Sequence, residues 1–183
     1  MKNVLVPLAE GCEELEAVTI IDLLRRADVK VVVAGLKDGP VEASRKVKIL
    51  PDTTLDEALS RSYDMIVLPG GLPGADNLNN DPRIQNLLKT MHQKGAYVAA
   101  ICAAPAILGK AGLLSGKKAT SYPGFLDKMN LPDVQYTGAA VECDGNVITS
   151  KGPGTAMDFA LQLIEILRGK EVRQTVEAGL MRA

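Results

Sequence analysis

Short apolar runs alternate with longer amphipathic stretches along the chain. The apolar runs are four to six residues long, which suits strands, and the stretches between them repeat apolar positions at helical spacing. The predicted strands cover residues 3–8, 30–34, 65–68 and 97–101. The predicted helices cover residues 13–26, 84–91 and 157–168. This alternation predicts an α/β protein with parallel strands joined by crossover helices.

The two runs at 65–68 and 97–101 are almost continuously apolar, which is typical of central strands that helices cover on both faces. Two hairpins are also expected. One pairs residues 41–44 with 47–50, and the other pairs 139–142 with 146–149 around the turn Asp144-Gly145. No repeat, low-complexity tract or linker divides the chain, so residues 1–183 are predicted to form one domain.

Composition narrows the possible partners. The net charge is -1, and the aromatic residues are two Phe and four Tyr with no Trp, so neither a basic phosphate-binding surface nor a base-stacking platform is expected. The first residues do not form the long apolar stretch of a signal peptide, and no run approaches the roughly 20 apolar residues of a membrane span. We therefore expect a cytoplasmic protein without nucleic-acid or membrane partners.

Cys102 stands where the strand 97–101 meets an expected helix start, with Pro105 in the first turn. A residue at such an elbow is often strained and presents its side chain to a cleft, and a helix N-terminus favours a thiolate. A lowered thiol pKa is therefore expected. The alternative is a buried small hydrophobic residue. Cys12 and Cys143 have acidic neighbours that would raise a thiol pKa, so neither is the expected nucleophile.

Glu16 is the candidate partner acid. It lies four residues before Ile20 on the apolar face of the helix 13–26, so it would point toward the core or the cleft and stay protonated beside Cys102. Glu13 lies near the same stripe, and spacing alone does not separate the two. The single histidine, His92, is expected on the surface near a helix end, which argues against a Cys-His hydrolase.

Two glycine loops complete the candidate site. Gly70 and Gly71 follow the buried strand 65–68 and could aim backbone N–H groups at an oxyanion. Residues 152–155, which include Pro153, precede the last long helix and could pack against the elbow or hold an anion. Neither loop matches a nucleotide-binding fingerprint, and ordinary strand-to-helix turns would explain both.

Four segments together resemble the ThiJ/PfpI superfamily, most closely its parkinsonism-associated protein deglycase branch. They are residues 9–16 (AEGCEELE), 67–71 (VLPGG), 99–105 (AAICAAP) and 149–155 (TSKGPGT). The resemblance spans essentially the whole chain. It implies a flavodoxin-like three-layer sandwich with a mainly parallel central sheet and a cysteine nucleophile elbow, usually assembled as a homodimer.

The resemblance also implies roles for individual residues. Cys102 would be the reactive cysteine, Glu16 rather than Glu13 its partner acid, and the amides of Gly71 and Ala103 the oxyanion donors. Ala103 stands where the protease and chaperone-like branches carry His. Tyr122 stands where the closest branch often has one. Tyr122 and Pro153 are implied pocket positions, and Arg26 and Arg45 are implied candidates for an anion site of the pocket near the dimer surface.

The implied activity is that of a deglycase or glutathione-independent glyoxalase, which acts on methylglyoxal, glyoxal and their early adducts without a metal or organic cofactor. Expected partners are therefore small dicarbonyls or glycated proteins and metabolites. The alternative is an oxidative-stress sensor or redox-regulated chaperone that uses the same cysteine. A glutamine amidotransferase-like hydrolase is weaker, because the site lacks a histidine.

Overall fold

The computed structural model describes residues 1–182 and is built on a seven-stranded sheet in the order β10-β11-β7-β6-β1-β2-β5. All neighbouring strands are parallel except β10 and β11. The strands of this sheet are β1 (Asn3–Leu8), β2 (Lys30–Gly35), β5 (Thr53–Thr54), β6 (Met65–Leu68), β7 (Tyr97–Ile101), β10 (Val141–Asp144) and β11 (Val147–Ser150). Two small pairs stand apart: β3 (Val41–Glu42) with β4 (Lys48–Ile49), and β8 (Lys118–Ala119) with β9 (Gln135–Tyr136).

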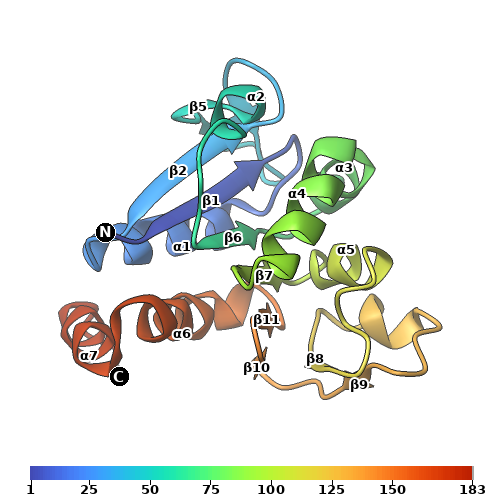
Figure 1. The fold of residues 1–183 in the computed structure, drawn as a ribbon. Coiled ribbons are helices and arrows are strands. Elements are labelled where there is room, and N and C mark those ends of the chain that lie inside the picture. Colours follow the sequence, from blue (N-terminus) through green and yellow to red (C-terminus); the bar gives the residue numbers. More distant parts are fainter. Residues whose placement is uncertain (183) are drawn as a thin grey trace.

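Helices cover both faces of the sheet, which confirms the predicted three-layer sandwich (Figure 1). The α-helices are α1 (Glu14–Arg26), α2 (Leu55–Ala58), α3 (Gly74–Asn80), α4 (Pro82–Gln93), α5 (Pro105–Lys110), α6 (Ala156–Arg168) and α7 (Lys170–Gly179). Short 3-10 helices are η1 (Leu126–Lys128) and η2 (Pro153–Thr155). Within residues 1–182, none of the helices is both long enough and apolar enough to cross a bilayer.

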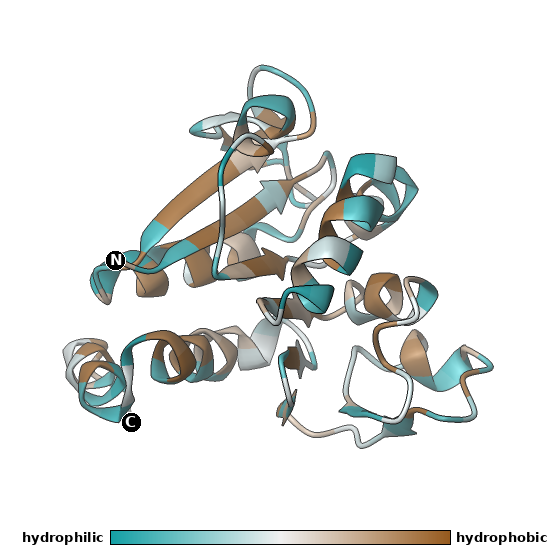
Figure 2. Ribbon diagram, viewed as in Figure 1, coloured by the Kyte–Doolittle hydropathy of each residue, from teal (hydrophilic) through white to brown (hydrophobic). Residues whose placement is uncertain are grey.

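The core has two halves, one on each side of the sheet, because successive strand residues point to opposite faces. In β1, Val4, Val6 and Leu8 join the half that α1 and α6 cover, whereas Leu5 joins the half under α2 to α5. Brown, apolar strands inside and teal positions on the outer helices show this division in Figure 2.

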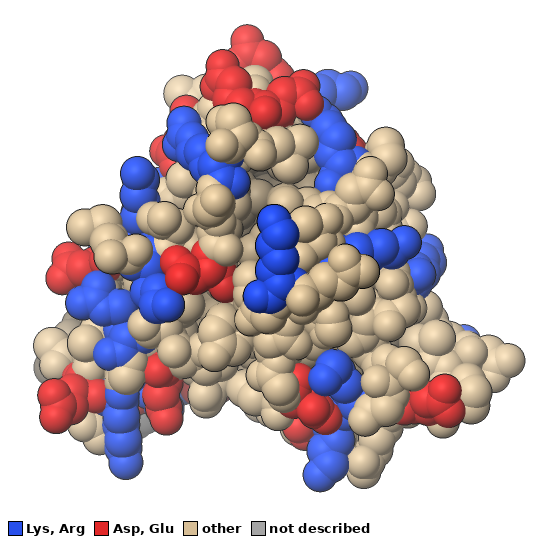
Figure 3. Space-filling model, viewed as in Figure 1, with Lys and Arg blue, Asp and Glu red and all other residues tan. Residues whose placement is uncertain are grey.

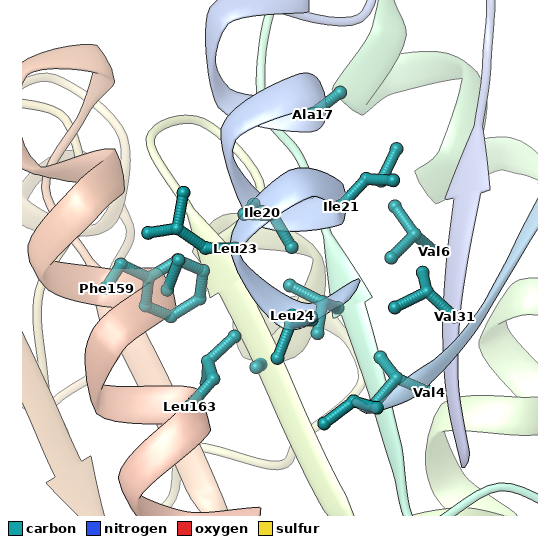
Figure 4. Packing of buried hydrophobic residues seen from close by; sticks show 14 of the residues in the cluster. Val4, Val6, Ala17, Ile20, Ile21, Leu23, Leu24, Val31, Phe159 and Leu163 are labelled. Carbon is teal, nitrogen blue, oxygen red and sulfur yellow. The ribbon is translucent and has the colours of Figure 1, made fainter. Parts of the chain in front are cut away.

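The contact between α1 and α6 forms the centre of one half. Figure 4 shows Ile20, Leu23 and Leu24 of α1 beside Phe159 and Leu163 of α6. The Phe159 ring is fully buried, and truncating such a ring to Ala typically costs about 3–5 kcal/mol. This packing holds α1, and with it the acid at its first turn, firmly against the sheet.

The main predicted elements are confirmed, and several boundaries differ. The central strands β1, β6 and β7 have the predicted bounds, whereas the later hairpin is shifted to 141–144 and 147–150 and Glu13 caps α1 instead of starting it. Three α-helices, α2, α3 and α7, were not predicted. Gly169 does end α6, but its φ of 89° turns the chain directly into α7.

The order of the strands in the sheet indicates where the ligand-binding cleft lies. If the five strands β1, β2, β6, β7 and β11 are numbered by their order along the chain, their order in the sheet is 2-1-3-4-5, which is the flavodoxin order. The strand order reverses its direction between β1 and β6. Ligands of such sheets bind beyond the carboxyl ends of the strands at this reversal. The loops after β1, β6 and β7 meet there, and they carry the residues singled out in the sequence.

Candidate active site

Cys102 stands at the elbow between β7 and α5, as predicted. Its φ is 65°, a left-handed conformation that is unfavourable for a residue with a side chain and that recurs at functional sites. Two backbone hydrogen bonds hold it there: its N–H donates to the Ser150 carbonyl at 3.0 Å, and its carbonyl accepts from the Tyr122 N–H at 2.9 Å. Pro105 occupies the first turn of α5. The strain is thus compensated by bonds from two neighbouring segments.

The amides of Gly71 and Ala103 both hydrogen-bond to the Cys102 sulfur. Gly71 has a φ of 86°, and a Cβ there would lie 2.4 Å from the Glu13 nitrogen. Gly70 is equally constrained, because a Cβ would lie 2.6 Å from the Cβ of Cys102. Only glycines let this loop approach the elbow so closely. The structure therefore brings the implied oxyanion donors together around the sulfur.

Glu16 is fully buried in the first turn of α1 and faces the cysteine. Its Oε2 accepts the Gly70 N–H at 2.8 Å, and its carboxyl group hydrogen-bonds to the Cys102 thiol. Its Oε1 is buried without an ordinary nitrogen or oxygen partner. Glu13 instead accepts from the Ser44 hydroxyl at 3.0 Å. Glu16 is thus the acid beside the cysteine, and the choice that spacing left open is resolved.

The pKa shifts of the pair agree with the prediction for Glu16 and differ from it for Cys102. Burial raises the pKa of Glu16 to about 7, against the lowering effect of its hydrogen bonds from Gly70 and Cys102. Burial, then the Glu16 charge, raises the pKa of Cys102 to about 12, although the two amides lower it. The predicted low thiol pKa is wrong in direction, because α5 has only six residues and the partly buried thiol lies beside an acid. The sequence showed the helix start but not this burial.

A hydrogen-bonded carboxyl and thiol titrate as one unit. Burial raises the pKa of both groups, Glu16 to about 7 and Cys102 to about 12, so the carboxyl gives up its proton before the thiol does. The raised pKa of Glu16 agrees in direction with the expectation of a protonated carboxyl, although near pH 7 only part of the molecules hold this proton. Around neutral pH the pair exchanges between forms with two protons and one proton, and the one-proton form contains either a thiolate or a carboxylate that can accept the thiol proton.

The outer predicted residues separate into two groups. Tyr122 is half exposed, and its ring lies over Gly152, where a Cβ would be 3.2 Å from Cδ2; Pro153 follows directly. The Arg45 N–H donates to Glu14 Oε1 at 2.8 Å, which places Arg45 near the first turn of α1. These three residues lie around the site.

Arg26 does not lie near the site. It is the last residue of α1 and pairs with Asp22 at 2.8 Å. Ten residues of helix separate it from Glu16, or about 15 Å along the axis. Within one chain Arg26 therefore does not line the Glu16–Cys102 site, and its implied place in an anion site near a dimer surface stays a prediction.

The remaining cysteines and the histidine lie outside the site chemistry. Cys12 is buried, and its pKa is raised to about 12 by burial and nearby glutamates, whereas Cys143 is exposed on β10 with a raised pKa; both agree with the sequence argument. His92 is half-buried with a shielded Nε2, so the expected surface position is only partly right. Among residues 1–182, no group of three or more His, Cys, Asp or Glu side chains could hold a metal ion.

Ser150 shapes the elbow and was not singled out in the sequence. Its carbonyl accepts from Cys102, and its buried hydroxyl donates to the Ala140 carbonyl at 2.8 Å and contacts the Thr155 hydroxyl at 2.7 Å. Two polar residues, Thr149 and Ser150, end a buried strand. This pattern could have indicated the role of Ser150, since buried hydroxyls need hydrogen-bond partners.

These features define a class: flavodoxin-like α/β proteins with a cysteine at the elbow after a central strand and a buried acid beside it. The profile of the DJ-1/PfpI family matches residues 2–166, and the chain belongs to that family. The Parkinson disease protein 7 homolog of Danio rerio is 46% identical over 183 residues, which covers 98% of this chain and 97% of that protein. The predicted family is therefore confirmed.

Two further relatives inform fold and function. The crystal structure of Drosophila melanogaster DJ-1beta superposes with a TM-score of 0.95 at 47% identity and covers 100% of this chain and 98% of that one. A Caenorhabditis elegans protein named glutathione-independent glyoxalase DJR-1.2 is 38% identical over 162 residues, which covers 88% of this chain and 86% of that protein. The family to which the chain belongs thus contains a glyoxalase.

Proposed function

We propose that the protein is a cofactor-free glyoxalase and deglycase that converts methylglyoxal, glyoxal and their early adducts into 2-hydroxy acids. The observation that carries the proposal is the buried Glu16–Cys102 pair under the two amides of Gly71 and Ala103. It combines a nucleophile, an acid whose pKa lies near the operating pH, and two donors for a developing oxyanion. The named glyoxalase among the relatives supports the same chemistry.

The reaction begins with attack of the Cys102 sulfur on the aldehyde carbon of methylglyoxal. The thiol proton passes to Glu16, and the amides of Gly71 and Ala103 donate to the oxygen that gains negative charge. Glu16 then moves a proton from the former aldehyde carbon to the neighbouring carbon. The product is a 2-hydroxy thioester, and water cleaves it to lactate and free Cys102. The net reaction is addition of one water to methylglyoxal.

Deglycation follows the same steps from a hemiaminal or hemithioacetal adduct. Cys102 replaces the amine or thiol at the adduct carbon, and that group leaves with a proton from Glu16. Tyr122 is half exposed at the rim and can donate a hydrogen bond to the substrate, although an ordinary phenol pKa near 10 makes it a poor base at neutral pH. No histidine is required in this sequence of steps.

The test is lactate formation from methylglyoxal by the wild-type protein, Cys102→Ser, Glu16→Gln and the matched control Cys143→Ser. We expect product from the wild type and the control, and a loss of at least about 100-fold in the two site variants, in the range that removing a nucleophile or acid–base group produces. Undiminished lactate from Cys102→Ser would refute the proposal.

A second candidate function rests on the Glu16 carboxyl next to the Cys102 thiol, since its Oε1 is buried without a hydrogen-bond partner. Two equivalents of peroxide would oxidise the Cys102 thiol to a sulfinate, releasing two waters, and a protonated Glu16 could then donate to a sulfinate oxygen. Intact mass after mild peroxide should show two added oxygens on the Cys102 peptide. Equal oxidation of Cys12 and Cys143 peptides would count against a sensor role.

We also propose that the protein forms a homodimer through an exposed apolar face next to the site. Leu15 and Val18 on α1 are 50% and 48% exposed, and Val47 and Leu50 beside β4 are 50% and 76% exposed. Val18 and Leu50 line one hollow, so the face is continuous between the two elements. Sedimentation of the protein should give twice the monomer mass.

A further inference from the structure

Thr155 occupies the N-cap position of α6, but its side chain does not cap that helix. A threonine at this position normally accepts a hydrogen bond from an N–H in the first turn of its own helix. Thr54 does so for α2, where its hydroxyl accepts from the Glu57 N–H. The Thr155 hydroxyl lies instead 2.7 Å from the Ser150 hydroxyl and 3.0 Å from the Gly152 carbonyl oxygen. The side chain therefore holds the turn 150–155 and not the helix end.

The hydroxyl protons of this turn can be placed one by one. Ser150 donates its single hydroxyl proton to the Ala140 carbonyl at 2.8 Å, because a carbonyl can only accept. The 2.7 Å contact therefore needs Thr155 as the donor to Ser150. The Thr155 oxygen in turn accepts from the Gly152 N–H at 3.1 Å, and the Gly152 carbonyl is satisfied by the Thr155 N–H at 2.9 Å. The result is a directed chain of three hydrogen bonds in which each bond polarises the next.

Both backbone hydrogen bonds of Cys102 lead to this turn. The Cys102 N–H donates to the Ser150 carbonyl at 3.0 Å. The Cys102 carbonyl accepts from the Tyr122 N–H, and the Tyr122 ring lies over Gly152, where a Cβ would be 3.2 Å from Cδ2. Ser150 and Gly152 are the two residues that the Thr155 hydroxyl joins. Thr155 is thus placed to fix the backbone of Cys102 from both sides.

The conformation of Cys102 depends on such contacts. A left-handed φ of 65° persists at a residue with a side chain only where its surroundings enforce it. In this conformation the sulfur reaches the Glu16 carboxyl and the amides of Gly71 and Ala103. Surface charge supplies no comparable constraint on the face shown in Figure 3, because lysines, arginines and acids are intermingled there without a large patch of one sign. The place of the sulfur therefore rests on short-range hydrogen bonds.

We propose that Thr155 is a positioning residue for the reaction and acts on Cys102 through Ser150 and Gly152. The inference rests on the proposed function and extends it, because the hydroxyl bonds to the turn and acts at one remove from the reacting atoms. Without this hydroxyl, the Gly152 N–H and the Ser150 oxygen each lose a partner, and the elbow can relax away from the left-handed conformation. The chemical step then slows while substrate affinity is retained.

Lactate formation from methylglyoxal tests the role with variants that separate the hydroxyl from the shape of the side chain. Thr155→Val keeps the shape, and we expect kcat to fall about tenfold with KM changed less than about twofold, as loss of a hydrogen bond that orients a reacting group would produce. Thr155→Ser restores the hydroxyl and should recover most of the loss. Thr54→Val removes the N-cap hydroxyl of α2 and is the matched control with unchanged kcat. A wild-type kcat in Thr155→Val would overturn the proposal.

Alkylation of Cys102 by iodoacetamide tests the same role without turnover. Thr155→Val should slow the reaction of the Cys102 peptide at pH 7 by about threefold to tenfold, and Thr54→Val should not. When Glu16→Gln is already present, adding Thr155→Val should change the rate less than about twofold, because the thiol has lost the acid toward which it is held. Equal fractional losses with and without Glu16→Gln would overturn the proposal, since Thr155 would then act independently of the pair.

A second variant covers the case in which Thr155→Val does not fold, as judged by circular dichroism. Ser150→Ala interrupts the same chain of hydrogen bonds without adding volume to a buried position. It should lower kcat and the alkylation rate in the same direction, and wild-type values of both would overturn the proposal. If the wild type forms no lactate, the proposed function fails, and the alkylation rates still decide whether Thr155 positions Cys102.

Discussion

The substitution Glu16→Gln tests the central electrostatic result, because it removes the charge from the pair and keeps its shape. In the wild type the Glu16 carboxyl loses its proton near pH 7, so about half of the molecules have a carboxylate that can take the thiol proton at that pH, which makes them the reactive form. In the variant the Cys102 thiol titrates alone. Its pKa falls below about 12, since the Glu16 charge is gone, but burial still holds it above the ordinary 9.0.

The expected magnitude follows from these values. With a thiol pKa of 9.0 or higher, at most about one thiol in 100 is ionised at pH 7, so the reactive fraction falls at least about 50-fold. A more basic thiolate is intrinsically the better nucleophile, by roughly eightfold for two pKa units, so the observed rate at pH 7 should fall about fivefold to tenfold. The midpoint of the pH profile should rise by about two units or more.

The assay is iodoacetamide alkylation at fixed pH values, with the Cys102 peptide quantified by mass spectrometry so that Cys143 does not interfere. Glu171→Gln, an exposed glutamate on α7, is the matched control and should leave the midpoint near 7. A wild-type midpoint well below 7 that persists in Glu16→Gln would refute the reasoning. It would show that the two amides and the start of α5 ionise the thiol without help from the acid.

Three further results are expected. Gly70→Ala should abolish turnover and lower the unfolding free energy by about 1–3 kcal/mol, because its methyl would stand 2.6 Å from the Cβ of Cys102; a fully active variant would contradict this contact. Stability should fall by about 3 kcal/mol as pH rises from 4.5 to 7 and beyond, since native Glu16 holds its proton longer than the unfolded chain, and urea melts of Glu16→Gln should lack this component. Val18→Glu should convert the proposed dimer to monomers in sedimentation; an unchanged mass would place the interface elsewhere.

The elements predicted best are those with an unambiguous apolar pattern. Strands β1, β6 and β7 are buried along nearly their whole length, so their apolar runs and their structural bounds coincide. Helix α7 was missed for the opposite reason: only Val176 among its residues is buried, and ion pairs such as Arg173 with Glu165 at 2.7 Å attach it to α6. A polar helix held by tertiary contacts leaves no periodic apolar stripe to detect.

The features of the candidate site likewise divide into those that the sequence pattern predicts and those that it does not. The place of Cys102 and Glu16 could be predicted, because strand ends and helix faces follow from periodicity. The raised pKa of Glu16 could also be predicted from its place on the apolar face, whereas the raised pKa of Cys102 could not, because it depends on how far packing excludes water from the thiol. Arg26 shows a related limit: the resemblance supplied the residue but not the 10-residue helical separation from the acid. Burial and distance are properties of the folded chain.

The topology explains how residues 86 positions apart meet at one sulfur. Strands β1, β6 and β7 are neighbours in the sheet, and adjacent strands lie about 4.8 Å apart, so their carboxyl ends fall within roughly 10 Å. The first loop leads to the acid, the second supplies one amide, and the third supplies the nucleophile. Glycines then bring the loops into backbone contact: a Cβ on Gly74 would stand 2.5 Å from the Cys12 nitrogen. The geometry of the pair therefore depends on loop packing as much as on its own side chains.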